Sequence, residues 1–178
     1  MTYDQAAYCR IMLISGHAEE YDHIIENLLE TQNPLSDVVL ELSFCTRDRI
    51  KTLSVLNDYL SAASESDIDY NGSVFHMTLG FLNRLYAAGT LSIDALTEHM
   101  HRIAQASEHW LEDPWATMNN MWDYHLEARC GEFITLPDFT VKIERFLTFG
   151  ECFDIYSMAR PPKEPLLKRL FRRLKHRM

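Results

Sequence analysis

The sequence predicts an all-α protein: a single multi-helix domain of about eight packed helices, bundle-like or short α-solenoid-like, plus a basic amphipathic C-terminal helix. Apolar residues recur at steps of three and four along almost the whole chain, whereas the strict alternation of a half-buried strand is hard to find. All six prolines and five of the six glycines fall between these periodic stretches. A length of 178 residues suits one domain, and a hydrophobic content of 47% supplies its core.

Four helices are predicted in the first part of the chain: one from the capping box of Thr2 and Gln5 to about Ser15, one that ends before Asn33-Pro34, and two more over 35–44 and 47–63. Gly16 breaks the first of these helices, and Thr46 can cap the fourth. The third is very apolar for its length.

A polar run over 64–72 predicts the longest loop, and the helix expected after it, over 73–88, is apolar on most sides. We therefore expect this helix at the centre of the fold. Gly89 predicts its end and Ser92 predicts the N-cap of the next helix, so the two should form an antiparallel pair.

The chain continues with a tryptophan-rich helix. Asp113-Pro114 predicts an N-cap followed by proline at the first helical position, with an inward row of Trp115, Met118, Met121, Trp122 and Leu126. This row favours core packing, and a ligand pocket or an interaction hot spot is the alternative. A short extended piece is expected over 133–136, and a last helix of the domain should start at Pro137-Asp138, with an interruption at Gly150 and a continuation to Met158.

The net charge of −9 is divided very unevenly along the chain. Residues 160–178 contain eight Lys or Arg and one Glu, a sum of +7, which leaves −16 for residues 1–159. Pro161, Pro162 and Pro165 form a stiff spacer, because each proline fixes φ and removes a donor. We therefore predict an acidic all-α domain over 1–159, followed over 160–178 by the spacer and a basic amphipathic helix.

The C-terminal helix carries a narrow apolar stripe within a basic surface. Leu166, Leu170 and Phe171 lie in the stripe, and the basic residues are Lys168, Arg169, Arg172, Arg173, Lys175 and Arg177. Such a helix can lie on an anionic membrane surface, bind nucleic acid or dock into another protein. It can equally fold back onto its own acidic domain, and these alternatives stay open.

One loop resembles the first half of an EF-hand calcium loop, over about twelve residues. Asp67, Asp69 and Asn71 supply oxygen atoms at positions 1, 3 and 5, and Gly72 stands at position 6. Thr78 occupies position 12, where the family has a bidentate Glu. The residues therefore indicate either a weak cation site or a simple turn, with Ser73 capping the helix after it.

Two Glu-x-x-His spacings raise a second metal hypothesis. Glu20 with His23, and Glu98 with His101, have the spacing of ligand pairs in helical di-metal proteins. Such spacings are also expected by chance in a helical chain, so solvated surface pairs are the alternative.

Enzyme signatures are absent from the sequence. It contains no GxSxG, GxxxxGK[ST] or GxGxxG motif and no Cys-His signature, so we expect neither enzymatic activity nor a cofactor. The four cysteines have no CxxC spacing and are expected to be thiols, which together with the acidic N-terminal residues favours a cytoplasmic location.

These observations favour a non-enzymatic protein–protein interaction domain that binds a basic partner through its acidic surface, and an inhibitor or immunity-type protein is one form of this. The alternative is a peripheral adaptor whose residues 160–178 bind an anionic membrane surface or nucleic acid. A metal-binding protein that uses the EF-hand-like loop or the Glu/His pairs is a third hypothesis, and a homo-oligomer also stays open.

Overall fold

The computed structural model describes residues 1–45 and 48–157, and this part of the chain contains eight α-helices and no strand, as predicted. The helices are α1 (Tyr3–Ser15), α2 (Ala18–Thr31), α3 (Asp37–Ser43), α4 (Arg49–Ser61), α5 (Phe75–Ala87), α6 (Ile93–Ser107), α7 (Trp115–Cys130) and α8 (Leu136–Phe149). None of them is both long and apolar enough to cross a bilayer. The Thr46 cap and all the site residues of the basic C-terminal helix, from Leu166 to Arg177, lie outside the described residues.

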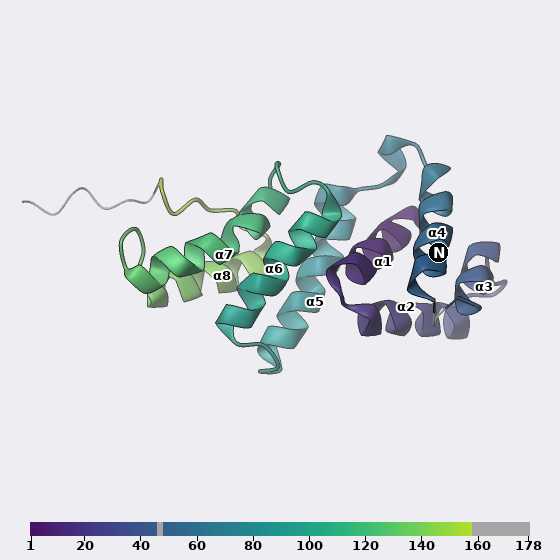
Figure 1. Ribbon diagram of the computed structural model, residues 1–178, viewed down its shortest axis with the longest axis horizontal. Coiled ribbons are helices and arrows are strands. Elements are labelled where there is room, and N and C mark those ends of the chain that lie inside the picture. Colours follow the sequence, from purple (N-terminus) through teal and green to yellow (C-terminus); the bar gives the residue numbers. More distant parts are fainter. Residues whose placement is uncertain (46–47, 158–178) are drawn as a thin grey trace, which may run out of the picture.

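The helices form two groups of four that lie along one elongated molecule (Figure 1). In the first group, α1 packs on α2 and α4, and α3 completes the group by packing on α2 and α4. In the second group α5 to α8 each contact the next helix, and α8 packs back on α5. The main bridge between the groups is the packing of α1 against α6 and against the turn that precedes α5.

Helix α1 lies between two separate cores. Ala6, Cys9 and Leu13, at steps of three and four, belong to a smaller core with α2, α3 and α4. The opposite side of the helix, including Ile11 and Met12, belongs to a larger core with α5 to α8. Because it is apolar on both sides, α1 buries both, as expected for a fully internal helix. Helix α5 lies near the middle of the molecule (Figure 1), but α1, not α5 as the sequence indicated, is the helix enclosed from both sides.

Most helix ends follow the predicted signals. Thr2 and Gln5 form the capping box of α1, Ser92 accepts a hydrogen bond from the Ala95 amide, and Gly89 follows the end of α5. Gly16 ends α1 with a φ of +93°, a conformation that glycine adopts without steric cost. This allows a two-residue link to α2.

The start of three helices differs from the prediction. The carboxylate of Asp48 caps α4 by accepting from the Lys51 amide at 3.1 Å, so the helix begins after residue 47. Pro114 is the N-cap of α7, and Asp113 instead accepts hydrogen bonds from the amide and hydroxyl of Thr117. Thr135 caps α8, which places the first helical residue at Leu136, ahead of Pro137.

Three further predictions about the second half were wrong. Residues 133–136 form a bend and a helix start rather than an extended strand. Helix α8 ends at Gly150 and does not resume within the described residues, although Ile155 still packs into the larger core. In α7, Trp122 and Leu126 are exposed, because packing on α6 and α8 selects the side of the helix with Trp115, Met118 and Met121.

We predict that Ile11→Ala lowers the free energy of unfolding by about 2–5 kcal/mol, since it opens a cavity beside the helix that links the two groups. Ile11 is 1% exposed and belongs to the larger core. Urea denaturation followed by circular dichroism and by tryptophan fluorescence measures the effect. Both signals should shift together, since α1 couples the groups.

Ile50→Ala is the matched control, because Ile50 on α4 is 84% exposed. Its effect should stay below about 0.5 kcal/mol. An Ile11→Ala protein as stable as the wild type, or two separated transitions, would contradict a shared central helix.

Candidate functional site

The EF-hand-like loop uses its carboxylates to cap turns. Asp67 accepts hydrogen bonds from the amide and the hydroxyl of Ser64, which lowers the pKa of Asp67. Asp69 accepts from the amides of Gly72, at 2.9 Å, and Ser73, at 3.1 Å. It thereby caps a single π turn, η2 (Tyr70–Val74), that runs directly into α5, so Asp69 rather than Ser73 starts this helical segment.

The glycine of this loop has a steric role that explains the EF-hand resemblance. A Cβ atom at position 72 would overlap the carboxylate of Asp69. Glycine at position 72 therefore leaves room for the Asp69 carboxylate in the position it holds here, whether or not a cation binds. Asn71 is exposed in the same turn.

The two Glu-x-x-His pairs do not meet at one site. The carboxylate of Glu20 accepts hydrogen bonds from the Tyr8 hydroxyl at 2.9 Å and from Arg84 at 2.8 Å, while His23 is exposed. His101 donates from Nδ1 to the carbonyl oxygen of Asn119 at 3.0 Å. Within residues 1–45 and 48–157, no three His, Cys, Asp or Glu side chains are grouped as metal ligands would be.

An acidic surface covers the first group of helices. Between Arg10 and Arg47 the sequence contains seven carboxylates and no Lys or Arg: Glu19, Glu20, Asp22, Glu26, Glu30, Asp37 and Glu41. Glu19, Glu26 and Glu30 lie at steps of seven and four, on the solvent side of α2 opposite the buried Tyr21 and Ile25. Of the seven, only Glu20 forms an ion pair with a described residue.

Helix α3 adds apolar side chains to this acidic region. Asp37, Leu40, Glu41 and Phe44 follow one another at helical spacing on the side opposite Val39 and Leu42, which are buried. Leu40 is 45% exposed and Phe44 is 78% exposed. Helices α2 and α3 pack against each other at one end of the molecule (Figure 1), and we call their exposed rows the α2–α3 acidic surface.

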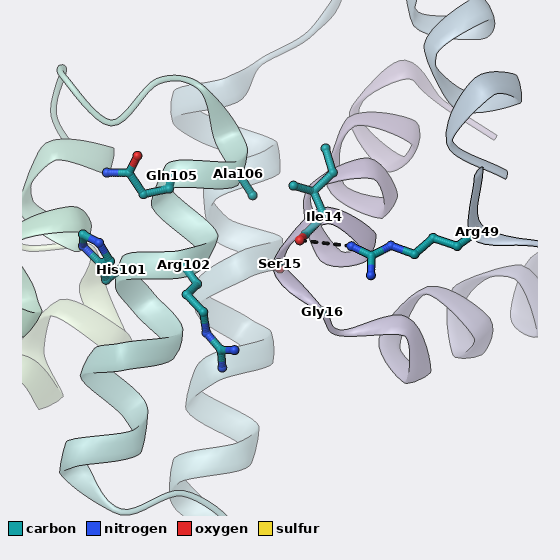
Figure 2. A pocket seen from close by; sticks show the side chains of 8 residues that line it. All are labelled: Ile14, Ser15, Gly16, Arg49, His101, Arg102, Gln105 and Ala106. Carbon is teal, nitrogen blue, oxygen red and sulfur yellow. Dashed lines mark hydrogen bonds between the residues drawn. The ribbon is translucent and has the colours of Figure 1, made fainter. Parts of the chain in front are cut away.

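A pocket of about 580 Å³ lies where the two groups of helices meet. Figure 2 shows it between the end of α1, the start of α4 and the second half of α6. Its lining is Ile14, Ser15, Gly16, Arg49, His101, Arg102, Gln105 and Ala106. In an acidic protein this lining contains two arginines and no carboxylate.

Helix α7 fixes two polar side chains of the pocket. Asn119 accepts from His101 through its carbonyl oxygen and from the Gln105 amide through Oδ1, at 2.7 Å. A carbonyl oxygen can only accept, so Nδ1 of His101 carries a proton and Nε2 remains for another contact. Both side chains are therefore oriented before any ligand arrives.

A pair of histidines lies close to Arg102. Nδ1 of His99 and Nε2 of His17 are 3.1 Å apart, and His17 also packs edge-on against Phe81. Burial, His99 and Arg102 lower the pKa of His17 to about 4, and burial together with Arg102 also lowers the pKa of His99. Both imidazoles are neutral at pH 7 and can share one hydrogen bond.

No pattern in the sequence pointed directly to the pocket. Arg49 and Arg102 are 53 positions apart, and each looks like an ordinary solvated charge on its own helix. The one available signal was that basic residues are rare in the acidic part of the chain. This signal could not show that two of these basic residues line the same pocket.

We predict that stability falls as the pH is lowered from about 7 to 5. The ordinary pKa of histidine is 6.5, so in the unfolded chain His17 binds a proton below that pH. In the folded protein the same side chain binds a proton only near pH 4. The loss therefore develops below pH 6.5. Urea denaturation at the two pH values measures it, and His17→Gln should show a smaller loss.

His23→Gln is the control for this pH effect, because His23 is exposed on α2. It should lose as much stability as the wild type between pH 7 and 5. An unchanged pH dependence in His17→Gln would mean that other groups cause the effect.

We predict that Asp69→Ala lowers the free energy of unfolding by roughly 0.5–2 kcal/mol, with or without millimolar calcium, because it removes a helix cap. Asn71→Ala should change little, since its side chain is exposed. Thermal denaturation of both variants with and without CaCl₂ measures these effects. A calcium-dependent increase in the stability of the wild type that is lost in Asn71→Ala would instead support a cation site.

Two surfaces of this chain thus have a chemistry that points to a ligand. The α2–α3 acidic surface combines exposed apolar side chains with carboxylates that have no ion-pair partner within residues 1–45 and 48–157. The pocket between α1, α4 and α6 is basic. Comparison of the chain with protein-family models, curated proteins and solved structures finds no match to any of them.

Proposed function

We propose that this protein is a non-enzymatic binding protein that recognises a basic protein partner through the α2–α3 acidic surface. The observation that carries the proposal is the exposed row of α3, in which Leu40 and Phe44 alternate with Asp37 and Glu41. A protein that inhibits a basic toxin or nuclease is one form of this function. The free cysteines, two buried and two exposed, suit a cytoplasmic location.

The two kinds of side chain have different roles in such a complex. Carboxylates that no described Lys or Arg pairs with leave a negative field that speeds the approach of a basic partner and rejects acidic proteins. Exposed aromatic and aliphatic side chains supply the area that is buried in the complex and slow its dissociation. Phe44 is the best anchor, because an aromatic ring that is 78% exposed has most of its area available.

Local structure also favours recognition by these two helices. The inner sides of α2 and α3 are held by Tyr21, Ile25, Val39 and Leu42, all of which are buried. The outer rows are therefore presented on a rigid support, and little conformational entropy is lost on binding. The chain between them, from Gln32 to Ser36, is tied by hydrogen bonds from Ser36 to the Gln32 side chain.

A second proposal concerns the basic residues 160–178. With a charge of +7 they could bind an anionic membrane surface or nucleic acid, as an adaptor would. In both proposals the binding affinity falls as the salt concentration rises, but the two proposals assign binding to different parts of the chain. Variants in each part separate them.

We predict that Phe44→Ala weakens partner binding at least tenfold, because an aromatic anchor of a protein interface contributes roughly 2 kcal/mol or more. The partner is captured from native lysate on the immobilised full-length chain, purified, and its affinity measured by surface plasmon resonance. The double variant Glu26→Lys, Glu30→Lys should mainly slow association and flatten the salt dependence.

Val141→Ala and Glu144→Lys on α8 are matched controls. Both positions are exposed and lie on the second group of helices. They should bind the partner as the wild type does. If capture survives the α3 and α2 variants but disappears when residues 160–178 are removed, the adaptor proposal replaces this one.

A further inference from the structure

We propose that the pocket between α1, α4 and α6 binds a small organic phosphate monoester, with the phosphate held between Arg49 and Arg102. This site is separate from the α2–α3 acidic surface and does not depend on the function assigned to it. The ligand would place its apolar part against Ile14 and Ala106, which line the same pocket.

The first argument concerns which arginines have a carboxylate partner. Six arginines lie in the described part of the chain, and Arg10, Arg84, Arg129 and Arg145 each form an ion pair with a carboxylate. The two others, Arg49 and Arg102, have no carboxylate partner among the described residues, and both line the pocket. With so many carboxylates available, two unpaired guanidinium groups in one pocket indicate a site for an external anion.

The remaining donors of these arginines are the second argument. Arg49 donates one hydrogen bond, to the Ile14 carbonyl oxygen at 3.3 Å, and a guanidinium carries five N–H groups. Arg102 donates none to any described residue. In Figure 2 the Arg49 side chain reaches from α4 toward the end of α1, and the Arg102 side chain runs from α6 along the edge of the pocket without pointing at Arg49. An anion in the pocket is contacted by both groups once the long, flexible Arg102 side chain turns toward Arg49.

The C-terminal end of α1 also borders the pocket. Its carbonyl groups do not prevent an anion from binding there. The last carbonyl groups of a helix are partly negative and would repel an anion if they were free. Here the Leu13 oxygen accepts from the Gly16 amide, the Met12 oxygen from the His17 amide, and the Ile14 oxygen from Arg49. Three of the last four carbonyl oxygens of α1 therefore already accept from protein donors.

The charge and the shape of the pocket select the ligand class. A phosphate monoester carries about −1.5 to −2 at pH 7, which matches two guanidinium groups better than a single carboxylate does. A volume of about 580 Å³ lies within the usual range for small-molecule sites. His101 and Gln105, both fixed by Asn119, are further polar groups at the rim.

The test is a titration of the full-length chain with phenyl phosphate, followed by calorimetry and by amide chemical shifts. We expect saturable binding, with shifts at Gly16 and Ala106, and weaker binding of inorganic phosphate and of benzoate. Benzyl alcohol, which is uncharged, should not bind. Arg102→Gln should weaken phenyl phosphate binding roughly tenfold or more, because a charge-assisted contact is lost.

Two further variants complete the experiment. Arg49→Gln should weaken binding to a similar degree, and its amide can still donate to the Ile14 carbonyl, so the fold is kept. Lys142→Gln on α8 removes the same charge away from the pocket and should bind as the wild type does. Circular dichroism confirms that each variant is folded.

Three outcomes would overturn the proposal. One is no saturable binding by the wild type up to about 10 mM phenyl phosphate, the weak limit for such a site. Another is equal affinity in the wild type and Arg102→Gln, or shifts confined to residues 160–178, since either places the anion elsewhere. The third is that inorganic phosphate binds as tightly as phenyl phosphate, because the apolar wall then contributes nothing.

Discussion

Helix α1 is apolar on two opposite sides, and both sides must be removed from water. No single layer of helices can do this, so one group packs on each side: α2 and α4 on the side of Ala6 and Cys9, and the larger group on the side of Ile11 and Met12. The elongated form of the molecule in Figure 1 follows from this arrangement. So does the pocket, because residues of α4 and α6, from different groups, line it around the end of α1.

Charge is arranged in relation to these two groups. Arginines on the second group and at the junction mostly have carboxylate partners, as Arg84 has in Glu20 and Arg129 in Asp94. Among the described residues, the outer rows of α2 and α3 have carboxylates without such partners, and Arg49 and Arg102 in the pocket are the arginines without them. The chain therefore has two unbalanced regions of opposite sign, and each can attract a ligand of the other sign.

Carboxylates that look alike in the sequence serve different purposes in the folded chain. Asp48, Asp67 and Asp69 accept backbone amides at the start of helical turns and are used by the fold itself. Glu26, Glu30 and Glu41 lie beyond the first turn of their helices, where backbone amides are already bonded, and face solvent. Only the second kind is available to a partner, which is why the α2–α3 acidic surface, and not the EF-hand-like loop, supports the proposed function.

The sequence by itself determined the helices, because their periodicity and their caps, such as Thr2 with Gln5 or Ser92, are local interactions within a few residues. It also determined that the stretch between Arg10 and Arg47 contains seven carboxylates and no Lys or Arg. Tertiary packing decided which side of α7 is buried, so that Trp122 is exposed while Trp115 is not. Tertiary packing alone also brought Arg49 and Arg102 to one pocket, because contacts between distant segments depend on how whole helices pack, which short-range patterns do not encode.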